Sequence, residues 1–274
     1  MTTNAQLTQW QVGGNTAEAY ERYLVPAIFR EGATQLVRQA GVHSGDRVLD
    51  VGCGTGIVAR TAADVVGSEG FVTGVDLNPG MLEVASSVST GSGAAIEWKQ
   101  GAAEDLPLAR SSVDVVLSQQ VFQFLEDHEQ ALREFHRVLR PGGRIGISVL
   151  RSLDHNRTYV PLIEAFRRHG GDDLGTMMAS PFRDWSAEEL RKMASSAGFK
   201  SPQVTVSLIT ARFPSIPEFI QQELSSSPLS DMVSTMPDDV RSAITEDVAA
   251  GLADYIDDQG VVHPLQTYLL VAEA

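Results

Sequence analysis

Three glycines that follow an apolar run could let the backbone approach a nucleotide-like ligand. Gly52, Gly54 and Gly56 come directly after residues 48–51, where only Asp50 interrupts the apolar side chains. This pattern predicts a buried strand, a tight turn and the start of a helix. Because the first amides of a helix have no partner within it, such a turn usually holds a nucleotide-like cofactor. The turn is therefore the first candidate for a binding site.

A carboxylate ends the next apolar stretch of the chain. Asp76 follows residues 71–75, one helix and one turn after the first strand. In a doubly wound sheet these two strands are neighbours, so the carboxylate would accept a hydrogen bond from each of two ribose hydroxyls. Asn78 and Pro79 then predict a helix start, as N-cap and first helical residue. The alternative for Asp76 is an acid that only caps a strand end.

The glycine spacing separates the cofactor classes. A dinucleotide-binding turn would place its third glycine at position 57, where Ile57 stands, and a phosphate-binding loop would continue with Gly-Lys-Ser or Gly-Lys-Thr. The turn itself contains no lysine or arginine. A cofactor without phosphates fits this turn better than a dinucleotide. A tight turn without any ligand remains the alternative.

The turn resembles motif I of the class I methyltransferases, which bind S-adenosylmethionine (SAM). Residues 98–107, 112–120 and 132–143 resemble later stretches of the same family, so the resemblance covers about residues 45–150. It implies an α/β fold: a Rossmann-like, seven-stranded mixed sheet with helices on both faces and an antiparallel last strand. It also implies SAM as the cofactor and a set of cofactor-binding residues, namely Tyr20, Tyr23, Asp50, Gly52, Gly54, Asp76, Leu77, Met81, Ala102, Ala103, Glu104 and Gln119.

The loop expected to hold adenine departs from the family pattern. Many relatives carry an acid directly after the loop glycine, whereas this chain has Ala102 after Gly101. Backbone groups of Ala102 and Ala103 would then read the adenine edge, with Glu104 as the acceptor for its amino group. Met81 is expected near the adenine ring.

An N-terminal helix is predicted over residues 15–40 from the three-to-four spacing of its apolar residues. Pro26 would kink or split it. In related methyltransferases such a helix lies over the cofactor, so Tyr20 and Tyr23 are candidates to close the site. The alternative is an ordinary amphipathic helix with two half-buried tyrosines. A terminal segment of this kind could also link two copies in a homo-oligomer.

A second addition begins after the fifth strand. Residues 159–166 show helical spacing, Met177 and Met178 follow, and Ser186 predicts a further N-cap. Chain inserted at this point would extend over the ligand-binding edge of the sheet, where methionines and aromatic rings suit an apolar pocket. The alternative is that these side chains form the insertion's own small core. Strands are expected at residues 204–210 and 266–272, with helices at 216–224 and 237–255 between them.

These elements predict one methyltransferase domain over residues 1–274. Its expected parts are an N-terminal helical cap (1–41), a SAM-binding core (42–150), a helical insertion or lid (151–200) and C-terminal strands and helices (201–274).

Composition limits the partners. The formal net charge of −14 disfavours nucleic acid and anionic membrane surfaces, since both are bound through lysine and arginine. No apolar run is long enough for a membrane span, and the N-terminus lacks a secretory pattern. The single cysteine, Cys53, fits a reducing cytoplasm and is interpreted as a small turn residue. Neither the cysteine nor the six histidines form a metal-binding pattern.

The sequence therefore predicts SAM-dependent methyl transfer to a small, mainly apolar organic acceptor. SAM carries its own leaving group, so a dedicated base is needed only when the acceptor must lose a proton. No catalytic residue can be named on these grounds. Two alternatives stay open: a SAM-binding enzyme that performs a rearrangement or cyclisation without transferring methyl, and a non-catalytic SAM-binding module.

Overall fold

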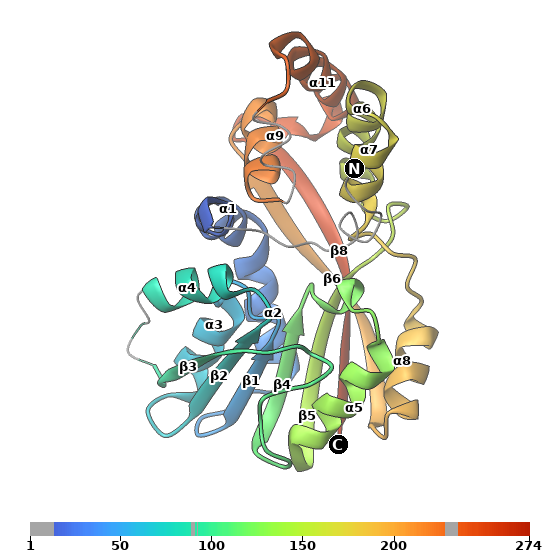
Figure 1. Cartoon of the computed structure of the whole chain (residues 1–274). Coiled ribbons are helices and arrows are strands. Elements are labelled where there is room, and N and C mark those ends of the chain that lie inside the picture. Colours follow the sequence, from blue (N-terminus) through green and yellow to red (C-terminus); the bar gives the residue numbers. More distant parts are fainter. Residues whose placement is uncertain (1–13, 89–90, 92, 228–234) are drawn as a thin grey trace. The chain divides into compact units, whose positions relative to one another are not determined.

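The structure, a computed structural model, describes residues 14–88, 91, 93–227 and 235–274 (Figure 1). The chain divides into two compact units. The sheet unit comprises Phe29–Val149, Trp185–Ser207 and Thr267–Ala274. The helical unit comprises Met1–Ile28, Leu150–Asp184 and Leu208–Gln266.

The central sheet has the strand order β3-β2-β1-β4-β5-β8-β6, and the short β7 pairs with β8. Strands β1 to β5 are mutually parallel where they pair. Bonds from Gly142 to Ala274 and from Arg151 to Gln266 show that β8 runs antiparallel to β5. The predicted α/β fold is thus confirmed, with β7 as an addition. The strands are β1 Arg47–Val51, β2 Phe71–Asp76, β3 Ile96–Gln100, β4 Val113–Gln119, β5 Leu139–Leu150, β6 Lys200–Phe213, β7 Ile256–Asp257 and β8 Gly260–Glu273.

Alternate residues of β1 enter two different cores of the sheet unit. Leu49 and Val51 pack with Phe135, whereas Val48 packs with Leu36 and other residues of the opposite face. This alternation arises because successive side chains of a strand point to opposite faces. β1 is therefore buried on both sides, as the apolar run predicts. The helices of this unit are α2 Arg30–Gln39, α3 Ile57–Val66, α4 Pro79–Ser87, α5 His128–Val138 and α8 Ala187–Ser196, with a 3-10 turn η2 at Phe122–Phe124.

Two predicted helix starts are confirmed by their caps. The Asn78 side chain accepts a hydrogen bond from the Gly80 amide, with Pro79 as first helical residue of α4. The Ser186 side chain accepts from the Glu189 amide at the start of α8. Although α8 belongs to the segment expected to form the lid, it packs against α5 in the sheet unit.

The segment expected to be one N-terminal helix is divided between the two units. That segment is instead α1 (Gly14–Ala19), a π-helix η1 (Tyr20–Phe29) that contains Pro26, and α2, which lies in the sheet unit. Proline has no amide hydrogen to donate to the preceding turn, and the wider π turn includes it without breaking the helix.

Among the described residues, the rest of the helical unit includes the helices α6, α7, α9 and α11 (Figure 1). Helix α6 (Val160–Gly170) packs against α7 (Asp172–Ala179) and α11 (Asp238–Gly251), and α11 also contacts α9 (Ile216–Ser225). A 3-10 turn, η3 (Arg157–Tyr159), directly precedes α6, and another, η4 (Ala253–Tyr255), follows α11 and leads to β7. In the described ranges, no helix is both long and apolar enough to cross a bilayer.

A methyl group at Gly74 should destabilise the sheet unit. A Cβ atom there would lie 2.4 Å from two atoms of the Trp98 ring, which is partly buried and packs against a core cluster, while Gly74 itself is buried. We expect Gly74→Ala to lower the free energy of unfolding by about 1–3 kcal/mol, the usual cost of overpacking. Urea denaturation followed by circular dichroism measures it. The double variant with Trp98→Leu should recover part of the loss, and equal losses in both backgrounds would contradict the steric explanation.

Candidate cofactor site

The turn after β1 is built from glycines in the left-handed region of backbone space. Gly52 and Gly56 have φ angles of 66° and 92°. A Cβ atom at Gly52 would lie 2.4 Å from the Val121 side chain, and one at Gly56 would lie 2.4 Å from the Trp98 ring. These positions therefore require glycine for conformation and for space. The predicted tight turn is confirmed.

Asp50 anchors the helix that the turn opens. Its Oδ2 accepts a hydrogen bond from the Ala59 amide at 2.9 Å, while Gly56, the N-cap of α3, offers no side-chain bond. A strand residue thus takes the place of a capping side chain. Asp50 is 1% exposed, and this burial raises the pKa of its carboxyl to about 7. The bond from Ala59 opposes that shift.

Asp76 joins the turn to the end of β2. Its Oδ2 accepts from the Gly54 amide and its Oδ1 from the Asn78 amide, each at 2.8 Å. Burial raises the pKa of this carboxyl, against the lowering effect of these bonds. The sequence pattern predicts the acid at the strand end but not its second role, which is to fix the turn. Its two oxygens retain further acceptor capacity for ligand hydroxyls.

The loop after β3 begins beside Asp76. The Gly101 amide donates to the Asp76 carbonyl at 3.1 Å, and Ala102 forms an isolated bridge with Asp105. The Glu104 carbonyl accepts from the Gln130 side chain at 3.1 Å. Backbone hydrogen bonds and one long-range side-chain bond therefore place this loop next to the strand end that carries Asp76.

Two residues that the sequence analysis did not name hold the rest of this loop. The Glu134 Oε2 atom accepts from the Leu106 amide at 2.9 Å, and Arg137 donates to the carbonyls of Leu106 and Leu108. Glu134 and Arg137 also bond to each other at 2.6 Å, which lowers the pKa of the glutamate. Their three-residue spacing on α5 was visible in the sequence, but their target in the loop was not.

Comparison with known proteins agrees with this geometry. The family model described as "Methyltransferase domain" matches residues 49–147. A demethylmenaquinone methyltransferase of Lactobacillus johnsonii is 32% identical over 175 residues, which are 60% of this chain and 72% of that protein. The chain belongs to the class I SAM-dependent methyltransferases.

Two further relatives show the extent of the likeness. A 2-phytyl-1,4-naphtoquinone methyltransferase of Synechococcus elongatus is 37% identical over 134 residues, which cover 48% of this chain and 55% of that protein. The chain thus spans about half the length of that relative. The YcgJ protein of Bacillus subtilis has a similar structure, with a TM-score of 0.57, 20% identity, and coverage of 89% of this chain and 98% of that one.

The remaining predicted residues of this methyltransferase have different surroundings. Leu77 is 54% exposed directly after Asp76, which leaves an apolar side chain at the strand end, whereas Met81 is buried. The Gln119 side chain donates to the Phe29 carbonyl at 3.1 Å, so part of its amide is already bonded within the protein. Tyr20 and Tyr23 belong to the helical unit and the other predicted residues to the sheet unit.

Cys53 of the methyltransferase is buried, and burial raises the pKa of its thiol well above the usual value. A protonated thiol is a poor nucleophile, so the structure agrees with its interpretation as a small turn residue. Among the residues that the structure describes, no group of three or more histidine, cysteine, aspartate or glutamate side chains could hold a metal ion.

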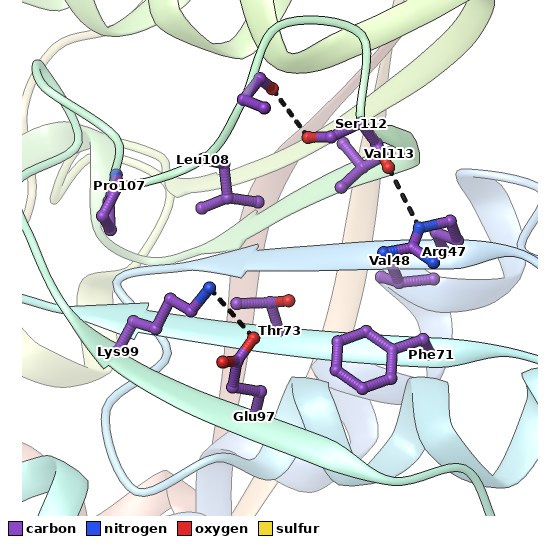
Figure 2. Close-up of a pocket in the computed structure, with 11 residues that line it drawn as sticks. Arg47, Val48, Phe71, Thr73, Glu97, Lys99, Pro107, Leu108, Ser112 and Val113 are labelled. Carbon is purple, nitrogen blue, oxygen red and sulfur yellow. Dashed lines mark hydrogen bonds and ion pairs between the residues drawn. The ribbon is translucent and has the colours of Figure 1, made fainter.

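A cavity of about 150 Å³ lies elsewhere in the sheet unit (Figure 2). Its lining includes the first residues of three strands, Arg47, Phe71 and Val113, together with the ion-paired Lys99 and Glu97. The glycine-rich turn follows the opposite end of β1. The cavity is therefore separate from the candidate cofactor site.

The raised pKa of Asp50 makes a prediction about stability. The folded protein retains a proton that the unfolded chain releases, so this contribution is fully present below about pH 4 and is lost as the pH rises to about 7. Asp50→Asn keeps an acceptor for Ala59 but does not titrate. We expect the unfolding free energy of wild type minus variant to fall by up to about 1.4 kcal/mol per pH unit across this range.

Urea denaturation of both proteins from about pH 4 to pH 8 measures this difference. All other titrating groups are common to both proteins, so their contributions cancel to first order. A difference that does not change with pH would contradict a raised pKa at Asp50.

Proposed function

We propose that this protein transfers the methyl group of SAM to a small, mainly apolar organic acceptor. The observation that carries the proposal is the joining of three segments at one sheet edge: Asp76 bonds to Gly54 of the turn, and Gly101 bonds to Asp76. This edge is formed by the carboxyl ends of β1 and β2, which face the same side because the two strands are parallel. Ligands of open α/β sheets bind outside such strand ends.

The residues at this edge fit the parts of SAM. Asp76 would accept from ribose hydroxyls, and Leu77 and the amides of Ala102 and Ala103 would contact adenine, with Glu104 as the acceptor for its amino group. Thr55 supports a polar ligand at the turn, because its buried hydroxyl has no partner among the described residues. A buried polar group of this kind usually marks a place where a ligand or water bonds.

The bound cofactor supplies an activated methyl group and its own leaving group. The protein's contribution is then to hold donor and acceptor in line and to keep water away from them. We propose that Tyr20 and Tyr23 take part by covering the cofactor. The same N-terminal segment would link two copies if the enzyme forms a homo-oligomer.

The relatives' names support an apolar ring compound as acceptor. One is named for demethylmenaquinone and another for 2-phytyl-1,4-naphtoquinone. The net charge of −14 further favours an uncharged or cationic small molecule over nucleic acid. A chain with a single cysteine cannot form an internal disulfide and fits a reducing compartment, so we propose that the protein is cytoplasmic.

The test is incubation of the purified protein with SAM and a panel of hydroquinones, phenols and amines. We expect micromolar binding of SAM by calorimetry, and release of S-adenosylhomocysteine with at least one acceptor. Product formation with unchanged SAM would replace methyl transfer by a rearrangement or cyclisation. SAM binding without turnover of any panel member would favour a non-catalytic module, and absence of binding at millimolar SAM would overturn the proposal.

Asp76→Asn should weaken SAM binding and leave the fold intact. Asparagine keeps one acceptor oxygen for the Gly54 or Asn78 amide but loses the charge offered to ribose hydroxyls. Because hydrogen bonds to charged groups contribute about 1.5–3 kcal/mol, we expect an increase of about tenfold or more in the Kd for SAM. Calorimetry measures the Kd.

Asp64→Asn is the matched control, because Asp64 is an exposed acid on α3 of the same unit. It should bind SAM as the wild type does. Unchanged affinity in Asp76→Asn would contradict ribose recognition by this residue. A parallel melting curve of each variant separates lost recognition from a loosened turn.

A further inference from the structure

The helical unit contains a histidine whose surroundings are unusual for a core position. His263 lies on β8, is 0% exposed, and neither of its ring nitrogens has a hydrogen-bond partner among the described residues. Burial lowers the pKa of this imidazole to about 3, so the ring is neutral and carries one donor and one acceptor. Leaving both unpaired costs stability that a phenylalanine at the same place would not cost.

Aromatic rings surround this imidazole. The ring centroid of Phe219 lies 4.2 Å from that of His263, and those of Tyr159 and Phe213 lie 5.5 Å from it. The ring centroid of Phe182 lies 5.0 Å from that of Tyr159, and Phe182 is only partly buried. The rings therefore lead from the buried imidazole to a side chain that solvent reaches.

A second polar group accompanies these rings. The Tyr159 hydroxyl donates to Glu223 Oε1 at 2.7 Å, and both residues are buried. Burial raises the pKa of Glu223 to about 7, while the bond from Tyr159 opposes that shift. The hydroxyls of Thr158, which precedes Tyr159, and of Ser226, three residues after Glu223, are also buried without a described partner. The helical unit thus buries unsatisfied polar atoms besides those of His263.

We infer that His263 and the rings of Tyr159, Phe213 and Phe219 form a binding site for a hydroxyl-bearing aromatic molecule of the phenol or hydroquinone class. A planar ligand would make the same tilted and edge-on ring contacts that these residues make with one another. Its hydroxyl can donate or accept, so it pairs with the neutral imidazole in either tautomer. Identifying this ligand as the methyl acceptor rests on the proposed function, whereas the binding site itself does not.

The alternative is that His263 has only a structural role and hydrogen-bonds to an internal water molecule. The two explanations differ in what the imidazole does for a ligand. If His263 binds a ligand hydroxyl, removing its nitrogens abolishes discrimination between a ring with a hydroxyl and the same ring without one. If it binds water alone, no such discrimination depends on it.

The probes are 1-naphthol and naphthalene, titrated by fluorescence into the 274-residue protein without SAM. We expect the wild type to bind 1-naphthol about tenfold or more tightly than naphthalene, the equivalent of one buried hydrogen bond. His263→Phe keeps a ring and should bind both probes equally, with a melting temperature equal to or above that of the wild type. His263→Gln retains a donor and an acceptor and should recover part of the preference.

His43→Phe is the control, since His43 is exposed on the sheet unit and its loss should leave the preference unchanged. A wild type that binds neither probe, or both equally, would overturn the site. A full preference in His263→Phe would overturn it as well. Because SAM is absent, none of these results depends on the proposed methyl transfer, which the release of S-adenosylhomocysteine tests separately.

Discussion

The candidate cofactor site depends on one carboxylate that accepts hydrogen bonds from a turn and from a helix start at once. The Asp76 carboxylate accepts hydrogen bonds from the amides of Gly54 and Asn78. The turn after β1 and the helix start after β2 are therefore held by the same side chain. In a partly buried position such charge-assisted bonds are stronger than they would be in water. The proposed ribose ligand and the glycine-rich turn therefore share one side chain. The proposed ribose recognition and the loop conformation would be coupled at this residue.

The sheet unit supplies the rigidity that this coupling requires. β1 is buried on both faces, so the end of the strand that leads into the turn is held from two sides. Asp50 adds a bond to the first turn of α3, and Glu134 with Arg137 holds the loop that follows β3. Each of these bonds joins a side chain to backbone atoms, which fixes loop position without requiring particular loop side chains. The loop can consequently differ from the family pattern at Ala102 and still keep its place.

The helical unit buries polar groups beside its apolar core. Leu162, Phe166 and Met178 are buried there, and so are His263 and the Tyr159–Glu223 pair, which lie among aromatic rings. Burying polar groups is costly unless they are bonded, so the unbonded ring nitrogens of His263 favour a role in binding over a role in stability. A SAM-dependent enzyme needs both a rigid donor site and a site adapted to its acceptor.

The sequence by itself determined the features that depend on neighbouring residues. The alternating strands, the glycine-rich turn and the caps at Asn78 and Ser186 follow from local backbone preferences and from burial patterns. Only the tertiary structure decided which distant groups meet. The Leu106 amide donates to Glu134, 28 positions away in the sequence, and the Gln119 side chain donates to the Phe29 carbonyl, 90 positions away. The packing of α8 on α5 and the rings around His263 are of the same kind. Such contacts form only when the chain folds back on itself. A local pattern of residue types does not show which residues, far apart in the sequence, will then lie close together.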